Sequence, residues 1–393
     1  MRGYGIGLLA VGWVLATVVF AFGPEDALSV RPAGFEEVRT RLELARFQES
    51  TALWGASTWV QLDRVRDWKY RAGVELGIDP VRQAQARLNR AQSQRYLRKR
   101  ARDAVYRALD LHARTWQAQV DLEAARIALR IAKLHLEALK YHGAGTLELE
   151  DARLAVDDAE IALLAAENRL RAARAEAAFL GLAGEAEPRV LRFALPPPRE
   201  DRVAELESAF QAAQRDRSWR GLFSLRAAAV YTGSGDFEYR FEVWTSEPRL
   251  GLSMAPKFPF SRPGDWRFTL SARIRLDPAS WAQVRQADLA LAEQRAVAAR
   301  RSAERRLDLE YWRRQAELAE ERLKLAEERF ALAKKRAVRA QQRLQLGLIA
   351  PLDKERAFWD RLRAESRLAA AWAAYLKAVQ GYLEAADGEW RQL

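Results

Sequence analysis

The sequence has no cysteine, and only three histidines and two methionines among its 393 residues. The lack of cysteine excludes a disulfide framework, a thiolate metal site, a cysteine nucleophile and a lipid-modified N-terminal cysteine. A phosphate-binding loop, a dinucleotide fingerprint and a zincin helix are also missing. His135 and His142 are seven positions apart, too far to share an ion on one helix, and surface histidines are the favoured interpretation. We therefore expect no enzymatic activity, no cofactor and no metal site.

The N-terminus has the pattern of a targeting segment. Arg2 is followed by an apolar run from Ile6 to Phe22 and then by Gly23 and Pro24. This pattern predicts a secretory signal peptide over residues 1–23, with an uncleaved membrane anchor as the alternative. Both interpretations place the rest of the chain outside the cytoplasm. The formal net charge of +12 is therefore not expected to mean nucleic-acid binding, although such a charge otherwise suits nucleic acid or acidic lipid.

Two stretches are nearly free of proline and glycine and have the heptad pattern of very long helices. We predict long helices over residues 80–142 and 279–346, and shorter returning helices over residues 147–180 and 352–386. Leu318, Leu325 and Leu332 form one heptad row, and Leu323 belongs to another row about 200° away around the helix. A helix with two apolar flanks needs a neighbour on each side, as a stave in a barrel wall has.

Alternating apolar and polar residues predict strands before each long helix. In the first half the pattern covers about residues 52–62 and 68–78, and in the second half about residues 223–232, 237–244, 249–255 and 266–276. A proline-rich linker at residues 184–200 separates two units, residues 24–183 and 201–393. Each unit is expected to contain a short helix, strands, a very long helix, a turn and a shorter helix.

The predicted strands suit a membrane. A strand of eleven residues is about 36 Å long and crosses the apolar layer of an outer membrane when tilted. A soluble sandwich that buries the apolar face is the alternative. Because open strand edges are costly in lipid, a membrane sheet of this size has to close with copies of itself, and four strands from each of three copies give twelve. Five tryptophans near the strand ends fit an aromatic girdle: Trp54, Trp59, Trp68, Trp244 and Trp266.

The same turn motif follows both long helices. The pattern Gly-x5-Asp-x3-Ala matches Gly145, Asp151 and Ala155 in the first turn and Gly347, Asp353 and Ala357 in the second. The repeated unit, the strands before each long helix, the Asp-Pro step at residues 277–278 and this motif together resemble the TolC-type outer-membrane efflux protein family over essentially the whole mature chain. In both turns the glycine is expected to permit the reversal.

The resemblance implies a fold that is mainly α with a membrane β-barrel: a homotrimer with a β-barrel in outer-membrane lipid and a long α-helical barrel in the periplasm. It implies an outer-membrane channel of a tripartite efflux or type I secretion system, which exports small molecules or proteins. Its partners would be a periplasmic adaptor (membrane fusion) protein and an inner-membrane pump, met at the helix turns. The alternative is a periplasmic coiled-coil tether or an adaptor protein without a pore.

The resemblance also points to residues at the periplasmic tip turns, where Gly143 lies beside the motif glycines Gly145 and Gly347. Asp353 and its counterpart Asp151 are candidates for a pore constriction, and capping of the returning helices is the alternative role. Arg356 stands where some members of the family have a second acidic residue, so their closed-state network is not expected here in full.

Two segments leave alternatives open. The strands at residues 237–254 form either a hairpin that extends outside the membrane, which is the favoured interpretation, or two further barrel strands. A basic run on the first long helix forms either a solvated helix face or a positive belt inside the tube that favours anionic solutes. The run consists of Arg95, Arg98, Lys99, Arg100 and Arg102.

Overall fold

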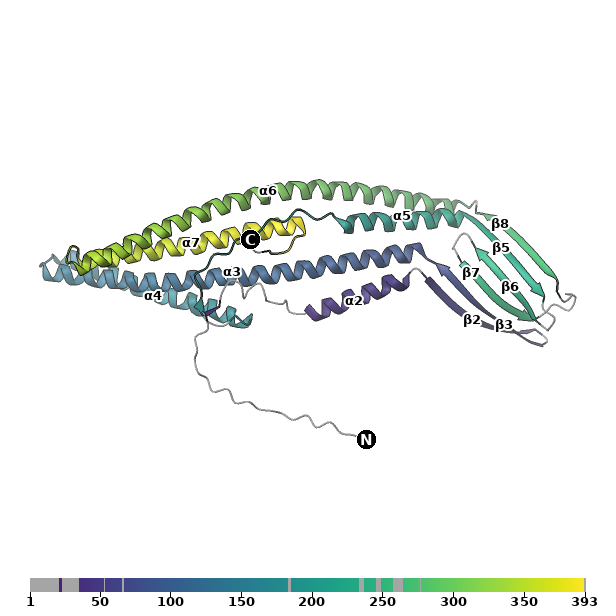
Figure 1. Cartoon of the computed structure of the whole chain (residues 1–393), viewed down its shortest axis with the longest axis horizontal. Coiled ribbons are helices and arrows are strands. Elements are labelled where there is room, and N and C mark those ends of the chain that lie inside the picture. Colours follow the sequence, from purple (N-terminus) through teal and green to yellow (C-terminus); the bar gives the residue numbers. More distant parts are fainter. Residues whose placement is uncertain are drawn as a thin grey trace, which may run out of the picture.

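The computed structural model is an elongated molecule with a β-sheet at one end and two helix turns at the other (Figure 1). It describes residues 21–22, 35–52, 54–65, 67–182, 185–232, 237–244, 249–256, 264–275 and 277–391. The predicted signal peptide at residues 1–23 lies outside the described residues except for Ala21–Phe22 (β1). This short strand pairs in parallel with Glu185–Ala186 (β4).

Two very long helices run from the sheet to the turns. Helix α3 spans Pro80–Tyr141 and helix α6 spans Pro278–Gln345, with 62 and 68 residues. Both begin with proline at the first helical position, where its fixed φ suits the helix and its missing N–H is no loss. The carboxylate before each proline caps the helix: Asp79 accepts from the N–H groups of Val81 and Arg82, and Asp277 accepts from that of Ser280. An Asp-Pro step therefore turns strand into helix in both halves of the chain.

Four shorter helices lie beside the long ones. Helices α4 (Thr146–Phe179) and α7 (Pro351–Ala386) return from the turns, and α2 (Phe35–Ala52) and α5 (Arg202–Leu222) precede the strands. Near the turns the packing order is α4-α3-α7-α6, and nearer the sheet it is α2-α3-α5-α6. Figure 1 shows α5 continuing the line of α7. None of the described helices contains an apolar stretch of the length needed to span a bilayer.

The described strands, other than the short pair, form one antiparallel sheet in the order β2-β3-β7-β6-β5-β8. Their bounds are Trp54–Val65 (β2), Asp67–Ile78 (β3), Phe223–Thr232 (β5), Phe237–Trp244 (β6), Arg249–Pro256 (β7) and Trp266–Ile274 (β8). The favoured prediction set residues 237–254 apart as a hairpin outside the membrane, but β6 and β7 instead pair with β5 and β3 in the middle of the sheet. The described sheet of this one chain thus has six strands, where four barrel strands were expected.

The main cluster of buried apolar residues lies where α7 packs between α3 and α6. Trp372, Leu376 and Leu383 of α7 are fully buried there. The proline-rich linker crosses this core, and its carbonyl oxygens at Leu191 and Pro196 accept hydrogen bonds from the side chains of Trp372 (3.1 Å) and Tyr382 (2.7 Å). Burial raises the pKa of the Tyr382 hydroxyl. The linker is therefore a strap that holds α7 in place.

Candidate functional site

One face of the sheet is apolar and exposed. In β8, Trp266, Phe268, Leu270 and Ile274 alternate with polar residues, and Phe268 is 79% exposed. Strand pairing continues this face through Ala229 of β5 and Phe241 of β6 to Leu252 of β7. A soluble sandwich would cover such a face with a second layer, and no described element covers it. An apolar surface of this kind marks contact with lipid or with another protein.

The opposite face carries ion pairs between strands. Glu238 and Glu242 of β6 are only 7% exposed. The Glu242 carboxylate accepts two hydrogen bonds from Arg226 of β5, at 2.6 and 2.7 Å, and also pairs with Arg240. The Glu238 carboxylate pairs with Arg267 of β8 at 2.5 Å. Burial makes each pair more costly to break than a surface pair, so these contacts fix β5, β6 and β8 side by side and leave a charged surface opposite the apolar one.

The tryptophans of the predicted girdle whose side chains are described divide between these faces. Trp266 lies on the apolar face, 52% exposed and next to Tyr231 and Phe268. Trp54, Trp59 and Trp68 belong to β2 and β3, but their side chains lie outside the described part of the structure, so the girdle stays a prediction for these three. The girdle prediction is wrong for Trp244, which lies on the polar face with its ring over Gly251 and 5.6 Å from the Arg226 guanidinium.

The two tip turns have the same backbone design, although the sequence motif pairs their glycines incorrectly. Gly143 and Gly347 both have φ of +68°, and both follow the C-cap residue of a long helix, which is His142 or Leu346. In each turn the N–H of the glycine and of the next residue bond back to the helix end, as in a Schellman motif. Gly145 instead has φ of −63° and precedes α4. Gly143, not Gly145, is therefore the counterpart of Gly347.

The candidate constriction residues are all exposed near these turns. Asp151 is in the second turn of α4, while Asp353 and Arg356 are in the first two turns of α7. The N-cap positions are Gly145 and Ala350, and neither α4 nor α7 has a side-chain hydrogen bond to its first turn. The capping role considered for the two aspartates is therefore wrong, because both lie inside their helices and not at their starts.

The helices at the two edges of the layer each have an apolar row that nothing in the described part of the chain covers. Leu318, Leu325 and Leu332 of α6 are 42%, 47% and 49% exposed, whereas Leu323 on the other flank is fully buried against its neighbours. Helix α6 thus has the predicted second apolar flank, and no described helix packs against it. Helix α4 has the matching feature at the opposite edge, with Leu147, Leu154 and Ile161 exposed at heptad spacing.

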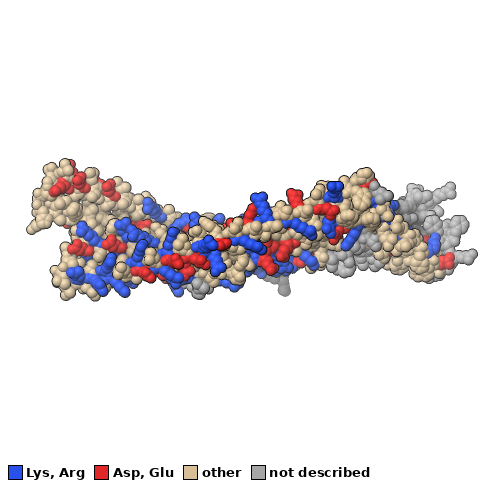
Figure 2. Space-filling view, turned by 90° about the horizontal axis from the view of Figure 1, so that it is seen from above, with Lys and Arg blue, Asp and Glu red and all other residues tan. Residues whose placement is uncertain are grey.

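These edges also carry opposite charges near the turns. The last fifteen residues of α6 include five cations and no acidic residue, whereas the first sixteen residues of α4 include six acidic residues and one arginine. The α6 segment ends at its turn and the α4 segment begins at its turn, and their lengths are similar. The two segments therefore lie at the same level along the long axis of the molecule. In Figure 2, acidic side chains gather on one lobe of the left end and Lys and Arg on the other. The residues are Lys334, Lys335, Arg336, Arg339 and Arg343 on α6, and Glu148, Glu150, Asp151, Asp157, Asp158 and Glu160 on α4.

The basic run on α3 contacts acceptors in its own chain. Arg98 pairs with Asp387 at 2.5 Å, Arg95 with Asp201 at 3.6 Å and Lys99 with Glu384 at 3.9 Å. Arg102 is 4% exposed and donates to the Leu383 carbonyl oxygen, and Arg100 donates to Tyr96. The prediction of a solvated helix face is wrong for Arg102. Four of these five cations bind the end of α7 or the start of α5, which favours a structural role.

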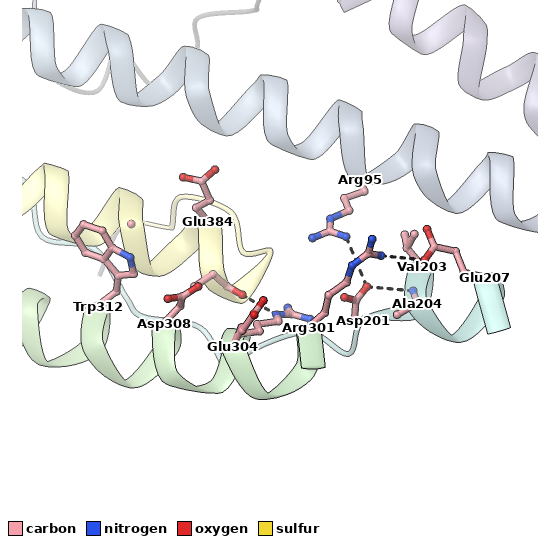
Figure 3. Close-up of a pocket in the computed structure, with 13 residues that line it drawn as sticks. Arg95, Asp201, Val203, Ala204, Glu207, Arg301, Glu304, Asp308, Trp312 and Glu384 are labelled. Atoms are coloured by element: carbon pink, nitrogen blue, oxygen red, sulfur yellow. Dashed lines mark hydrogen bonds and ion pairs between the residues drawn. The ribbon is translucent and has the colours of Figure 1, made fainter. Parts of the chain in front are cut away.

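A cavity of about 620 Å³ lies where α5 meets the end of α7 (Figure 3). Its arginines are paired across helices: Arg301 of α6 with Glu207 of α5 at 3.1 Å, and Arg95 of α3 with Asp201. Arg305 donates to the Ala385 carbonyl oxygen. In the described part of the chain no three metal-ligating side chains converge, here or elsewhere. The cavity is therefore a polar junction between helices, and we assign it no ligand.

Some of these features were not predicted from the sequence. His112 is fully buried, with its ring 5.4 Å from that of Trp372, whereas His135 and His142 are exposed. The cap at Asp79 could have been found, because Asp79-Pro80 repeats the Asp277-Pro278 step. The pairs of Glu238 and Glu242 depend on strand order, for which the sequence has no local signal.

The chain is similar to solved structures of outer-membrane channels. No protein-family model matches it, and no curated protein matches it in sequence. The outer-membrane channel OprN aligns with 93% of this chain and 89% of its own, with a TM-score of 0.55 and 15% identity. The open-state MtrE channel of Neisseria gonorrhoeae aligns with a TM-score of 0.52 and 13% sequence identity, over 93% of this chain and 88% of the MtrE chain. The outer-membrane protein VceC of Vibrio cholerae aligns with a TM-score of 0.51 and 14% sequence identity, over 93% of this chain and 95% of the VceC chain. With its two very long helices, their returning partners and a sheet at one end, the chain has the fold of the TolC-type outer-membrane efflux proteins.

Proposed function

We propose that three copies of this chain form a channel that crosses the outer membrane and continues through the periplasm. The channel is the outer component of a tripartite export system, with a periplasmic adaptor and an inner-membrane pump as partners. Similar solved structures are described as outer-membrane channels. The exported solute is a small molecule or a protein, selected by the pump and not by this chain.

The observation that carries this proposal is the two-faced sheet. Its apolar face is exposed around Phe268 and Leu270, and its other face holds the ion pairs of Glu238 and Glu242. Lipid on the apolar side and water on the charged side satisfy both faces together. A tether or an adaptor without a pore has no use for this arrangement.

Closure into a ring is supported by the two edges of one chain. Strand β2 and helix α4 lie at one edge, and β8 and α6 lie at the other. Contact between the α6 edge of one copy and the α4 edge of the next covers both exposed leucine rows and places the basic segment against the acidic one. Such head-to-tail contacts generate a closed ring when the rotation is right, and in the proposed trimer four helices from each copy form the wall.

We assign the tip turns to the periplasmic end, where the adaptor and pump dock. Asp353 and Asp151 then lie at the narrow end of the tube, with Arg356 beside them in the sequence. An exposed carboxylate ring attracts cations in a pore. We expect Asp353→Asn to reduce the preference of the channel for cations, measured as a change in reversal potential across a salt gradient.

The decisive experiment combines assembly with conductance. The mature protein is extracted in detergent, its mass is measured by native mass spectrometry, and it is then inserted into a planar bilayer. We expect a trimer and discrete conductance steps. A folded trimer that never conducts would contradict the channel function and would favour the alternative of a periplasmic tether without a pore.

A substitution on the α6 edge tests the ring itself. We expect Leu325→Glu to leave helix content unchanged and to abolish the trimer, because the charge would enter the seam between copies. Leu325→Met, which keeps the volume and the apolar character, is the matched control and should remain trimeric. Unchanged assembly of Leu325→Glu would remove the α6 edge from the interface.

A further inference from the structure

The sheet has six strands and two open edges, and this sets the size of any barrel that copies of it can close. We propose that the membrane part is an eighteen-stranded barrel, built from three six-stranded sheets, in place of the twelve strands expected from the sequence. This inference rests on the proposed trimer. At each of the two sheet edges the partner is another copy of the chain, a different copy at each edge.

The first support is that β6 and β7 are built as membrane strands. On β6, Tyr239, Phe241 and Val243 are 41%, 44% and 47% exposed, and they pair with Met254, Leu252 and Leu250 of β7. The same positions align with the apolar series of β5 on one side and of β3 on the other. A hairpin outside the membrane would not need to continue a lipid-facing surface without a break.

The second support is the charge on the opposite face. Both buried carboxylates lie on β6, and their partners Arg226 and Arg267 lie on β5 and β8. If β6 left the sheet, the ion pairs of Glu242 with Arg226 and of Glu238 with Arg267 would be broken. The polar face therefore holds the inserted hairpin in the sheet independently of the backbone hydrogen bonds.

The third support is strand direction. Strand β2 leads away from the helices and β8 leads back into α6. All neighbours within the sheet are antiparallel, and β8 of one copy beside β2 of the next continues that alternation. Six strands per copy is an even number, so the pattern closes around the ring with every backbone group paired, as lipid requires.

The fourth support is the match in circumference between the barrel and the tube. Eighteen strands about 4.8 Å apart, tilted by about 40°, give a circumference of about 110 Å. Twelve helices packed about 9 Å apart also give about 110 Å, whereas twelve tilted strands reach only about 75 Å. The six strands and four helical staves of one chain thus have nearly equal widths.

The functional consequence is a conduit that does not narrow where it enters the outer membrane. Barrels of sixteen to eighteen strands leave an aqueous channel. In this protein that channel is lined by the face that bears Arg226, Arg240, Glu238 and Glu242. The narrowest point is then left to the tip turns, and the barrel admits any hydrated solute that the helical tube admits.

Imaging of the full chain in lipid nanodiscs counts the strands directly. A trimer with eighteen strands supports the inference. A trimer with twelve strands, or with β6 and β7 outside the bilayer, overturns this inference and leaves the proposed channel intact. Absence of a trimer overturns both, so the two failures are distinguishable.

Disulfide trapping gives an independent test, because the chain has no cysteine of its own. Leu76 and Leu250 are register partners on β3 and β7, so we expect Leu76→Cys with Leu250→Cys to cross-link within one chain after mild oxidation. Ala227→Cys with Leu270→Cys joins β5 and β8 and is the matched control, since this hairpin exists in either barrel. Cross-linking of the control pair alone would place β7 away from β3 and refute the eighteen-stranded barrel.

Discussion

The helical core at mid-length and the sheet at one end of the molecule treat apolar side chains in opposite ways. At mid-length Trp372 is fully buried between α3, α6 and the linker, whereas Phe268 in the sheet is 79% exposed. Both regions use large apolar residues at regular spacing, with the helical period in one and the strand period in the other. The difference is that the helical middle supplies its own apolar surroundings, and the sheet has to receive them from outside the chain. In this protein the exposure of the large apolar side chains therefore indicates whether a region packs against its own chain or against surroundings outside the chain.

The largest expected loss of stability comes from a substitution in the buried helical core. Trp372→Ala removes a fully buried ring and the donor to the Leu191 carbonyl oxygen, and we expect it to lower the free energy of unfolding by about 3–5 kcal/mol. Thermal or denaturant unfolding in detergent, followed by circular dichroism, measures the change. Trp219→Ala is the matched control, because Trp219 is 39% exposed and its loss should cost far less. Equal losses would mean that the strap and α7 do not form the stable core.

The exposed end of the comparison is tested by adding a charge. Phe268→Arg should cost about 2–4 kcal/mol in a bilayer if its position is near the middle of the membrane. Tyr141→Arg changes a residue that is 89% exposed at the tip and should have almost no effect. Unfolding from lipid vesicles by guanidinium chloride measures both. If Phe268→Arg is as harmless as Tyr141→Arg, the sheet does not face lipid.

A close contact between α6 and α7 gives a smaller effect within the buried region. A Cβ atom on Gly381 would lie 2.4 Å from the ring of Trp312, so Gly381→Ala should overpack this contact and cost about 1–3 kcal/mol. Gly221→Ala has nothing within 4 Å of the added carbon and should be neutral or slightly stabilising. The comparison is made by unfolding in detergent. A neutral Gly381→Ala would show that the two helices can separate at this point without cost.

Much of this arrangement could be predicted from local pattern. The alternation from Trp266 to Ile274 and the heptad row through Leu323 each report one element and the face it buries or exposes. The order of the strands could not be predicted in this way, because pairing of β7 with β3 and of β8 with β5 joins segments that are distant in the sequence. A hairpin that extends from the sheet and one that enters it have the same alternation.

The pairing of glycines predicted for the two tip turns was wrong for a different reason. The motif placed Gly145 opposite Gly347, but the left-handed residue has to follow the C-cap residue of the long helix, and that residue is Gly143. Helix ends are set by the last backbone hydrogen bonds, which a single glycine pattern does not locate. The burial of the linker was not predicted either, since the burial of Leu191 and Phe193 depends on the helix beneath them and not on their own sequence.

The smallest expected effect is at the junction between the two regions, where Asp277 starts α6. Hydrogen bonds from Ser280 lower the pKa of the Asp277 carboxyl below its usual value of 3.8. A carboxyl whose pKa is lower in the folded state contributes stability above its unfolded pKa, and that contribution is lost as the pH falls through the lowered value. Asn at this position still caps the helix but does not titrate. Below about pH 4 the wild-type protein should therefore lose stability relative to Asp277→Asn, in melting curves recorded between neutral and acidic pH. Parallel curves for the two proteins would mean that the Asp-Pro step holds this junction through its geometry and not through its charge.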